Sequence, residues 1–305
     1  MACYSLNVRT ISRGKNSSVV GAVSYISGRY LHDNYYSRHY AHQRDDVADM
    51  GIILPDSAPS EFQDLQTLLD ALNSSERRVD SQLAHHFKLA LPNELSHVEN
   101  VALIKEFCNQ NFIPKGRCAL YAVHKGQYDP AKHSPDIPPV SERKDNPHVH
   151  IIIPFRSLDS FGFAKTKLAS RSSNPSAELI SWRKSWADIQ NRAFERLGLD
   201  VRVSHKSLAD QGIKRQPELH MGYVAMNQEL RGDPSVRGDR YLEILSANQS
   251  SRRIKRSIEQ KLFDRKRLRS KQSKQRTPKQ KRSFREPNTP KIARNTRERT
   301  LSHEK

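Results

Sequence analysis

Apolar and polar residues alternate along several short stretches of the chain, a pattern typical of β-strands with one buried face. In QLAHHFKLALP, residues 82–92, one set of alternate positions holds three leucines, a phenylalanine and His85. The other set holds His86 and Lys88 between alanines. We therefore expect the leucine face to pack against helices and His86 to lie on the opposite, less apolar face.

The same reasoning divides most of the first 200 residues into strands and helices. Alternating or continuous apolar runs predict the strands, and apolar residues at helical spacing predict the helices. The expected strands are 2–10, 82–92, 117–124 and 146–155, and the expected helices are 17–28, 59–75, 96–112 and 176–197. Ser17 is the expected N-cap and Gly28 the expected end of the first helix, and Ser96 with Glu99 forms a capping-box pattern. This order predicts an α+β fold.

The positive charge is concentrated at the C-terminal end. The net charge is +19 over 305 residues. Residues 251–305 hold 21 Lys and Arg against 5 Asp and Glu, a net of +16, so the remainder is close to neutral. We expect a helix over 252–270 and disorder over 271–290, which lacks core-forming residues. A tail with this much positive charge favours contact with nucleic acid, and the alternative is a solvated, disordered end of the chain.

Three widely spaced cysteines, Cys3, Cys108 and Cys118, form neither a disulfide framework nor a Cys-rich zinc site. The sequence begins without the basic and apolar segments of a signal peptide, and its apolar runs are too short to span a bilayer. We expect a soluble cytoplasmic protein with no membrane insertion.

NPHVHIIIPF, residues 146–155, places two histidines inside a strongly apolar strand. His148 and His150 are two residues apart, so they project from the same face. Two interpretations stay open at this point. The imidazoles form a hydrogen-bonded pair at a sheet edge, or they are two ligands of a metal ion.

A third histidine, His124, ends the strand that precedes this one. The two strands flank one loop, so as antiparallel neighbours they would bring all three imidazoles together. Such a set can hold a divalent cation and leave positions open for substrate or water. A metal alone does not define a reaction, and the remaining clue is Tyr25 in the expected first helix, for which simple packing is the alternative.

These residues carry a family resemblance. Five stretches of the chain are similar, in the same order, to the MobA/MobL family of plasmid mobilisation relaxases. They are the first strand with GAVSYISGRYLHD, then ERRVDSQLAHHFKLALPNEL, YAVH, NPHVHIIIPFR and the long block 181–222. That family belongs to the HUH endonuclease superfamily. The resemblance covers about residues 1–225 and implies a central antiparallel sheet flanked by helices. It also implies a relaxase domain over 1–225. Beyond about residue 225 the composition turns polar, so we expect a linker over 226–250 and a DNA- or protein-binding tail over 251–305.

The resemblance implies a site- and strand-specific DNA endonuclease and strand transferase. Tyr25 would attack a phosphodiester at a plasmid transfer origin, leaving a 5′-phosphotyrosyl link and a free 3′-hydroxyl. His124, His148 and His150 stand at the metal-ligand positions, and the family usually uses Mg²⁺ or Mn²⁺. The implied partners are plasmid DNA, single-stranded around the nick, together with accessory mobilisation proteins and a coupling protein.

The chain departs from the family pattern at two places. Related sequences usually read A-R-E before the A-L-P strand, whereas this chain reads Ala84-His85-His86, so an acid that supports the site is replaced. His86 could serve as the base for Tyr25 or as an extra ligand, or could be an ordinary surface histidine beside Lys88. The second departure is the long loop between His124 and His148.

Candidate DNA contacts follow from aromatic and basic residues near these motifs. They are Arg29, Tyr30, Lys88, Lys206, Lys214 and Arg215. Three other functions stay open: a rolling-circle replication initiator or transposase of the same superfamily, a mobilisation protein that binds DNA without cleaving it, and a three-histidine metallohydrolase. In the first of these the tyrosine often follows the histidines, and here it precedes them.

Overall fold

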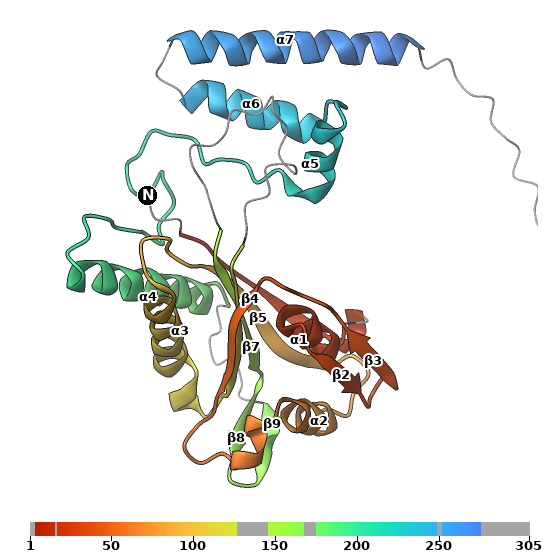
Figure 1. The fold of residues 1–305 in the computed structure, drawn as a ribbon, viewed down its shortest axis with the longest axis vertical. Coiled ribbons are helices and arrows are strands. Elements are labelled where there is room, and N and C mark those ends of the chain that lie inside the picture. The colour runs from red at the N-terminus through yellow and green to blue at the C-terminus, as the bar shows by residue number, and fades with distance from the viewer. Residues whose placement is uncertain (1–3, 16, 127–145, 168–174, 249–251, 276–305) are drawn as a thin grey trace, which may run out of the picture. The chain divides into compact units, whose positions relative to one another are not determined.

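A five-stranded antiparallel sheet forms the centre of the first compact unit (Figure 1). The computed structural model describes residues 4–15, 17–126, 146–167, 175–248 and 252–275. The strand order is β1-β5-β7-β6-β4, with bounds β1 Leu6–Ser12, β4 Val47–Ile53, β5 Gln82–Ala90, β6 Ala119–His124 and β7 His148–Pro154. The expected central antiparallel sheet flanked by helices is confirmed.

Helices cover both faces of this sheet, as the alternation of side chains requires (Figure 1). One face packs on α3 (His97–Asn111) and α4 (Pro175–Arg196), and the other on α1 (Val19–Ser27) and α2 (Leu65–Ser75). Phe87 and Leu89 belong to the first core and Ala84 to the second. The expected orientation is confirmed from Ala84 on. Leu83, which was expected beside Phe87 and Leu89, packs in the second core instead, where the register between β1 and β5 is irregular.

Two small hairpins lie beside the sheet and were not expected from the sequence. They are β2 Tyr30–Asp33 with β3 Arg38–Ala41, and β8 Arg156–Asp159 with β9 Gly162–Lys167. Their strands are only four to six residues long and lack a regular apolar alternation. β4 was missed for a similar reason: all seven of its residues are only partly buried.

Local signals at the helix ends behave largely as expected. The capping box of α3 is present, with Ser96 N–H donating to Glu99 Oε2 at 2.7 Å and Glu99 N–H donating to Ser96 Oγ at 3.3 Å. The N-cap of α1 is Ser18 rather than Ser17, because the Ser18 hydroxyl accepts from Gly21 N–H at 2.9 Å. Gly28 ends α1 in the left-handed conformation, with φ 69°.

The second compact unit consists mainly of two helices, α6 (Val236–Asn248) and α7 (Arg252–Gln275). The boundary between the units falls within α5 (Gly222–Leu230). Leu242, Ile258 and Leu262 form a small apolar core. Asp239 of α6 joins Arg265 at 2.8 Å and Arg269 at 2.6 Å, which holds the basic helix in place.

The helix expected over 252–270 is confirmed, and it continues into the stretch expected to be disordered. The rest of that stretch, from residue 276 on, lies outside the described residues. The expected linker over 226–250 contains α6. Within the described part of the chain, no helix is both long and apolar enough to cross a membrane.

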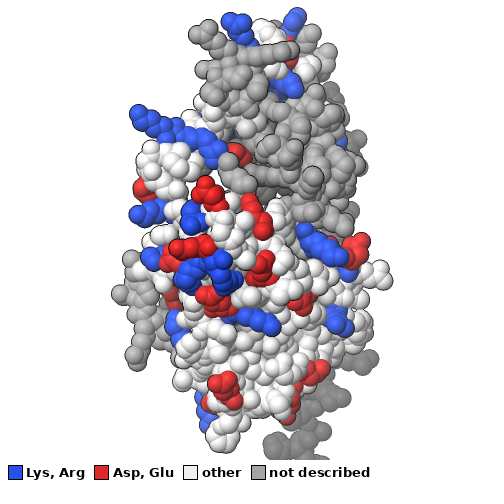
Figure 2. All heavy atoms as spheres, turned by 60° about the vertical axis from the view of Figure 1, so that its left-hand side comes forward, with Lys and Arg blue, Asp and Glu red and all other residues white. Residues whose placement is uncertain are grey.

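Charges of both signs lie side by side on the face of the molecule toward α3 and α4 (Figure 2). Arg192 of α4, for example, meets Glu106 of α3 at 2.7 Å. This face thus carries no strong charge of one sign among the residues that Figure 2 describes.

Candidate metal centre and nucleophile

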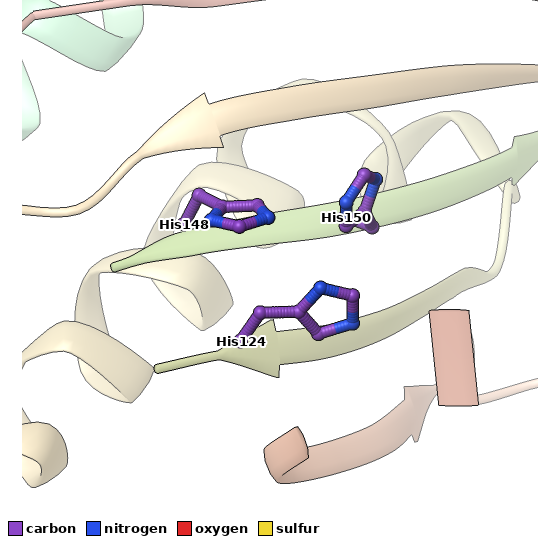
Figure 3. Close-up of side chains that lie close together, drawn as sticks. All are labelled: His124, His148 and His150. Carbon is purple, nitrogen blue, oxygen red and sulfur yellow. The ribbon is translucent and has the colours of Figure 1, made fainter. Parts of the chain in front are cut away.

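Three imidazoles converge at one end of two neighbouring strands. His124 is the last residue of β6 and His148 the first of β7, and the antiparallel register places these two residues opposite each other. His150 projects from the same face of β7 (Figure 3). One ring nitrogen from each residue lies within 4.8 Å of the other two. The predicted convergence of the three histidines is confirmed.

Hydrogen bonds to backbone carbonyls orient two of these rings. His124 Nε2 donates to Ile26 O at 2.7 Å, and His148 Nδ1 donates to Asn146 O at 2.9 Å. A carbonyl only accepts, so the remaining nitrogen of each neutral ring carries a lone pair. His124 Nδ1 is buried without a hydrogen-bond partner among the described residues. These are the features of a metal-ligating histidine, whose second nitrogen is fixed by an acceptor.

Burial also keeps the rings neutral, which is the charge state that binds metal. It lowers the pKa of His148 to about 4 and that of His150 to about 2, and it lowers the pKa of His124 as well. Because a metal ion binds the neutral imidazole, no ring has to lose a net proton to bind one at neutral pH. The three histidines can therefore hold a divalent cation.

The third ring, His150, is oriented by another histidine. His86 Nε2 lies 2.8 Å from His150 Nδ1, and Arg9 Nε donates to His86 Nδ1 at 3.2 Å. His86 is 4% exposed, and burial together with the charges of Arg9 and Lys88 lowers its pKa to about 4. Both ring nitrogens of His86 are thus engaged. In this arrangement neither nitrogen is free to take a proton from Tyr25 or to bind a metal ion. The roles of base and of extra ligand both stay predictions.

Tyr25 lies in the last turns of α1, with half of its surface exposed. Its ring meets the edge of His42 at 5.5 Å, and the Arg44 guanidinium carbon lies 4.9 Å from its centre. The next residue, Ile26, supplies the carbonyl that fixes His124. Because Gly28 ends the helix here, this carbonyl belongs to the last turn, where no backbone N–H within the helix is left for it. One hydrogen bond therefore ties the helix of Tyr25 to the histidine cluster.

Arg44 and Asp46 were missed by the sequence analysis. Arg44 forms a two-pronged ion pair with Asp46, at 2.8 and 2.6 Å, which holds the pKa of that carboxyl below its ordinary value. Asp46 Oδ2 lies 3.9 Å from His124 Nδ1. It is placed there because the next residue, Val47, pairs with His124 in the sheet. The only signal in the sequence is an acidic pair, Asp45-Asp46, shortly before the apolar stretch GIIL.

The other predicted residues are distributed around this centre. Lys88 faces His150 across the β5–β7 pair. Arg29 follows α1, and Tyr30 is 65% exposed and stacks on His39 at 5.3 Å. The remaining three, Lys206, Lys214 and Arg215, are exposed in the segment between α4 and α5.

A basic groove, which the sequence analysis missed as well, lies near the start of β5. Lys88 and Ala90, which pair with His150 and His148, lie toward the other end of that strand. The groove has a volume of about 790 Å³. Its charged lining residues come from the α2–β5 connection and the β8–β9 hairpin: Glu76, Arg77, Arg78, Asp80, Arg156, Lys165 and Lys167. Both acids are paired, Glu76 with Arg156 and Lys167, and Asp80 with Arg78. The groove therefore carries a net positive charge.

Known proteins resemble this chain over most of its length. The model of the MobA/MobL family matches residues 17–231. A probable mobilization protein MobA of Bifidobacterium longum is 29% identical over 87% of this chain and 51% of its own length. A conjugal transfer protein TraA of Rhizobium radiobacter is 27% identical over 76% of this chain and 22% of its own length. The chain thus spans about half or less of these relatives.

A solved structure has a similar fold. It comes from a study of the molecular basis of vancomycin resistance transfer in Staphylococcus aureus, and it aligns with a TM-score of 0.56 and 25% identity. The alignment covers 68% of this chain and 100% of the solved one.

Proposed function

The chain belongs to the MobA/MobL family, and from this premise we propose that it nicks one DNA strand at a plasmid transfer origin for conjugative mobilisation. The observation that carries the proposal is the bond from His124 Nε2 to Ile26 O, at 2.7 Å. It links a three-histidine metal centre to the turn of α1 that presents Tyr25. With a cation bound, this link would hold a nucleophile and a charge-stabilising ion at one place, as phosphodiester transfer requires.

In the proposed reaction the Tyr25 hydroxyl attacks a phosphorus atom of the strand. A bond forms between Tyr25 Oη and phosphorus, and the bond from phosphorus to the 3′-oxygen breaks. The phenol loses its proton and the 3′-oxygen gains one, so the products are a 5′-phosphotyrosyl link and a free 3′-hydroxyl. The link preserves the phosphoester for later resealing.

His124 through Nδ1, His148 through Nε2 and His150 would hold the cation, with the Asp46 carboxylate close by. A divalent cation there would stabilise the negative charge that develops on the non-bridging phosphate oxygens. We propose Mn²⁺ or Mg²⁺, and imidazole ligands favour Mn²⁺ of these two.

Arg44 is the group that assists Tyr25 in this proposal. A phenol with a pKa near 10 needs a base or a nearby cation to attack at neutral pH. The Arg44 guanidinium lies 4.9 Å from the centre of the Tyr25 ring, and Asp46 fixes it there. Its charge favours both the phenolate and the phosphate oxygens as they gain negative charge.

The DNA strand would reach the site over basic and aromatic side chains. Near Tyr25 these are Arg29, Tyr30 and Lys88, and elsewhere in the chain the basic groove and α7 offer charge for phosphates. Nicking is proposed for residues 1–225, and DNA or protein binding for 251–305. Accessory mobilisation proteins and a coupling protein are the proposed protein partners.

The deciding experiment incubates the purified protein with supercoiled plasmid or transfer-origin oligonucleotides and Mn²⁺, then denatures the mixture and looks for protein on the 5′ end. Tyr25→Phe should abolish the covalent product. Tyr35→Phe is the matched control, because Tyr35 is also exposed and its ring contact with Arg13 survives the change. Nicking by Tyr25→Phe would instead indicate attack by water, and binding without cleavage by the wild type would indicate a DNA-binding mobilisation protein.

A further inference from the structure

The three site histidines differ in what orients them. His124 and His148 donate to carbonyl oxygens, which leaves the other nitrogen of each ring free for a metal. His150 faces His86, whose ring nitrogens can each donate or accept. The protonation pattern of His150 is therefore decided by the next group in the chain of hydrogen bonds.

That group is Arg9, and its hydrogen bond to His86 favours the tautomer of His150 that does not bind a metal. A guanidinium only donates, so His86 Nδ1 must accept from Arg9 Nε. A neutral His86 then carries its proton on Nε2 and donates it to His150 Nδ1, 2.8 Å away. A neutral His150 consequently carries its own proton on Nε2, the nitrogen that its bond to His86 leaves for a metal.

Given the metal centre of the proposed function, we propose that Arg9 and the metal ion compete for the His86–His150 pair. When His150 Nε2 binds a cation, the proton of that ring lies on Nδ1 and is donated to His86 Nε2. His86 then carries its proton on Nδ1, facing the Arg9 N–H. Two donors cannot share a hydrogen bond, so Arg9 leaves. Each ring has one proton before and after, so the exchange needs no net proton uptake.

The placement of these residues follows from the sheet register. Arg9 of β1 pairs with His86 of β5, and His86 pairs with Ile152 of β7, one same-face position beyond His150. The three side chains therefore lie in a row across one sheet face. In this arrangement His86 is a positioning residue that acts through His150.

Mn²⁺ affinity, measured by isothermal titration calorimetry, tests the competition without reference to nicking. Arg9→Met removes the donor and keeps the length of the side chain, so it should tighten Mn²⁺ binding about tenfold, the lower end of the usual effect of groups behind a metal ligand. Arg9→Lys keeps a donor and a charge and should remain near wild type. Equal or weaker binding by a folded Arg9→Met protein would overturn the proposal.

His86→Glu supplies a second variant. A carboxylate only accepts, so it sets His150 in the metal-binding form whether or not Arg9 is present. Mn²⁺ binding should tighten, and adding Arg9→Met should bring no further gain. A full additional gain in the double variant would contradict the shared pathway through His86.

A direct readout is the tautomer of His150, observed in ¹⁵N-histidine NMR spectra of the wild type with and without Zn²⁺, a diamagnetic probe. The proton should lie on Nε2 without metal and on Nδ1 with it. A proton on Nδ1 in the metal-free protein would sink the proposal. The 5′-attachment assay decides the proposed function separately, because the wild type can nick DNA whichever tautomer it holds without metal.

Discussion

The basic groove yields a quantitative prediction about DNA binding. Arg77 and Lys165 line it and form no ion pair within the described part of the chain, whereas Arg78, Arg156 and Lys167 are paired with acids. These two residues should therefore supply the charge that meets DNA phosphates. We predict that the double substitution Arg77→Gln and Lys165→Gln weakens DNA binding and makes it less sensitive to salt.

The size of the effect follows from counterion release. The logarithm of the binding constant falls linearly with the logarithm of the salt concentration, and each phosphate contact makes this slope steeper by about 0.7 for single strands and about 0.9 for duplex. Losing two contacts should therefore make the slope shallower by roughly 1.4 to 1.8. Between 50 and 200 mM salt, the loss of affinity should then be about tenfold smaller in the variant than in the wild type.

Fluorescence anisotropy of a labelled transfer-origin oligonucleotide, titrated at several salt concentrations, measures this slope. The matched control is Lys105→Gln with Arg196→Gln, which removes the same charge from α3 and α4 on the other face of the sheet. If the groove variant and the control show the same slope, the groove does not contact DNA and the reasoning from its unpaired charges is wrong.

Three further predictions concern the site and the core. Arg44→Gln should slow nicking about 100-fold in single-turnover assays, and Arg44→Lys should recover part of the rate, because a cation near the reacting oxygens stabilises their charge; equal rates would exclude Arg44 from the reaction. In the metal-free protein, burial lowers the pKa of His86 and His148 to about 4, whereas an exposed histidine has a pKa of about 6.5. Between these two pH values the unfolded chain therefore binds more protons than the folded protein. The free energy of unfolding should therefore fall as the pH is lowered from 7 to 5. A midpoint of urea denaturation that does not change over this pH range would contradict this. Trp186→Ala should cost about 3–5 kcal/mol in urea denaturation, because Trp186 is fully buried between the sheet and α3; a loss below about 1 kcal/mol would show that the core collapses around it.

The main strands and helices could be predicted because their side chains alternate between two environments. In β5, His85 packs beside Phe155 and Trp182 on the α4 face, and His86 lies on the site face, as the alternation indicates. α6 was missed although Tyr241, Leu242 and Ile244 are buried in it, because the surrounding sequence is polar. Its apolar face is covered by α7, a partner that the local pattern does not reveal.

The candidate site divides in the same way. The histidines could be predicted because two adjacent strands of known direction bring them together. Arg44 and Asp46 could not, because their positions depend on the pairing of β4 with β6 and on the end of α1. Neither contact leaves a periodic pattern in the sequence.

His86 shows why residue type alone does not define a role. Its position on the site face followed from strand alternation, and base or ligand were reasonable roles for an imidazole there. The register adds Arg9 on one side and His150 on the other, and both ring nitrogens are then engaged. A carboxylate at this position could only accept from His150, whereas histidine transmits the donor character of Arg9 to the metal centre. If the proposed competition holds, histidine at position 86 makes metal binding dependent on Arg9 of β1, which an acid there would not do.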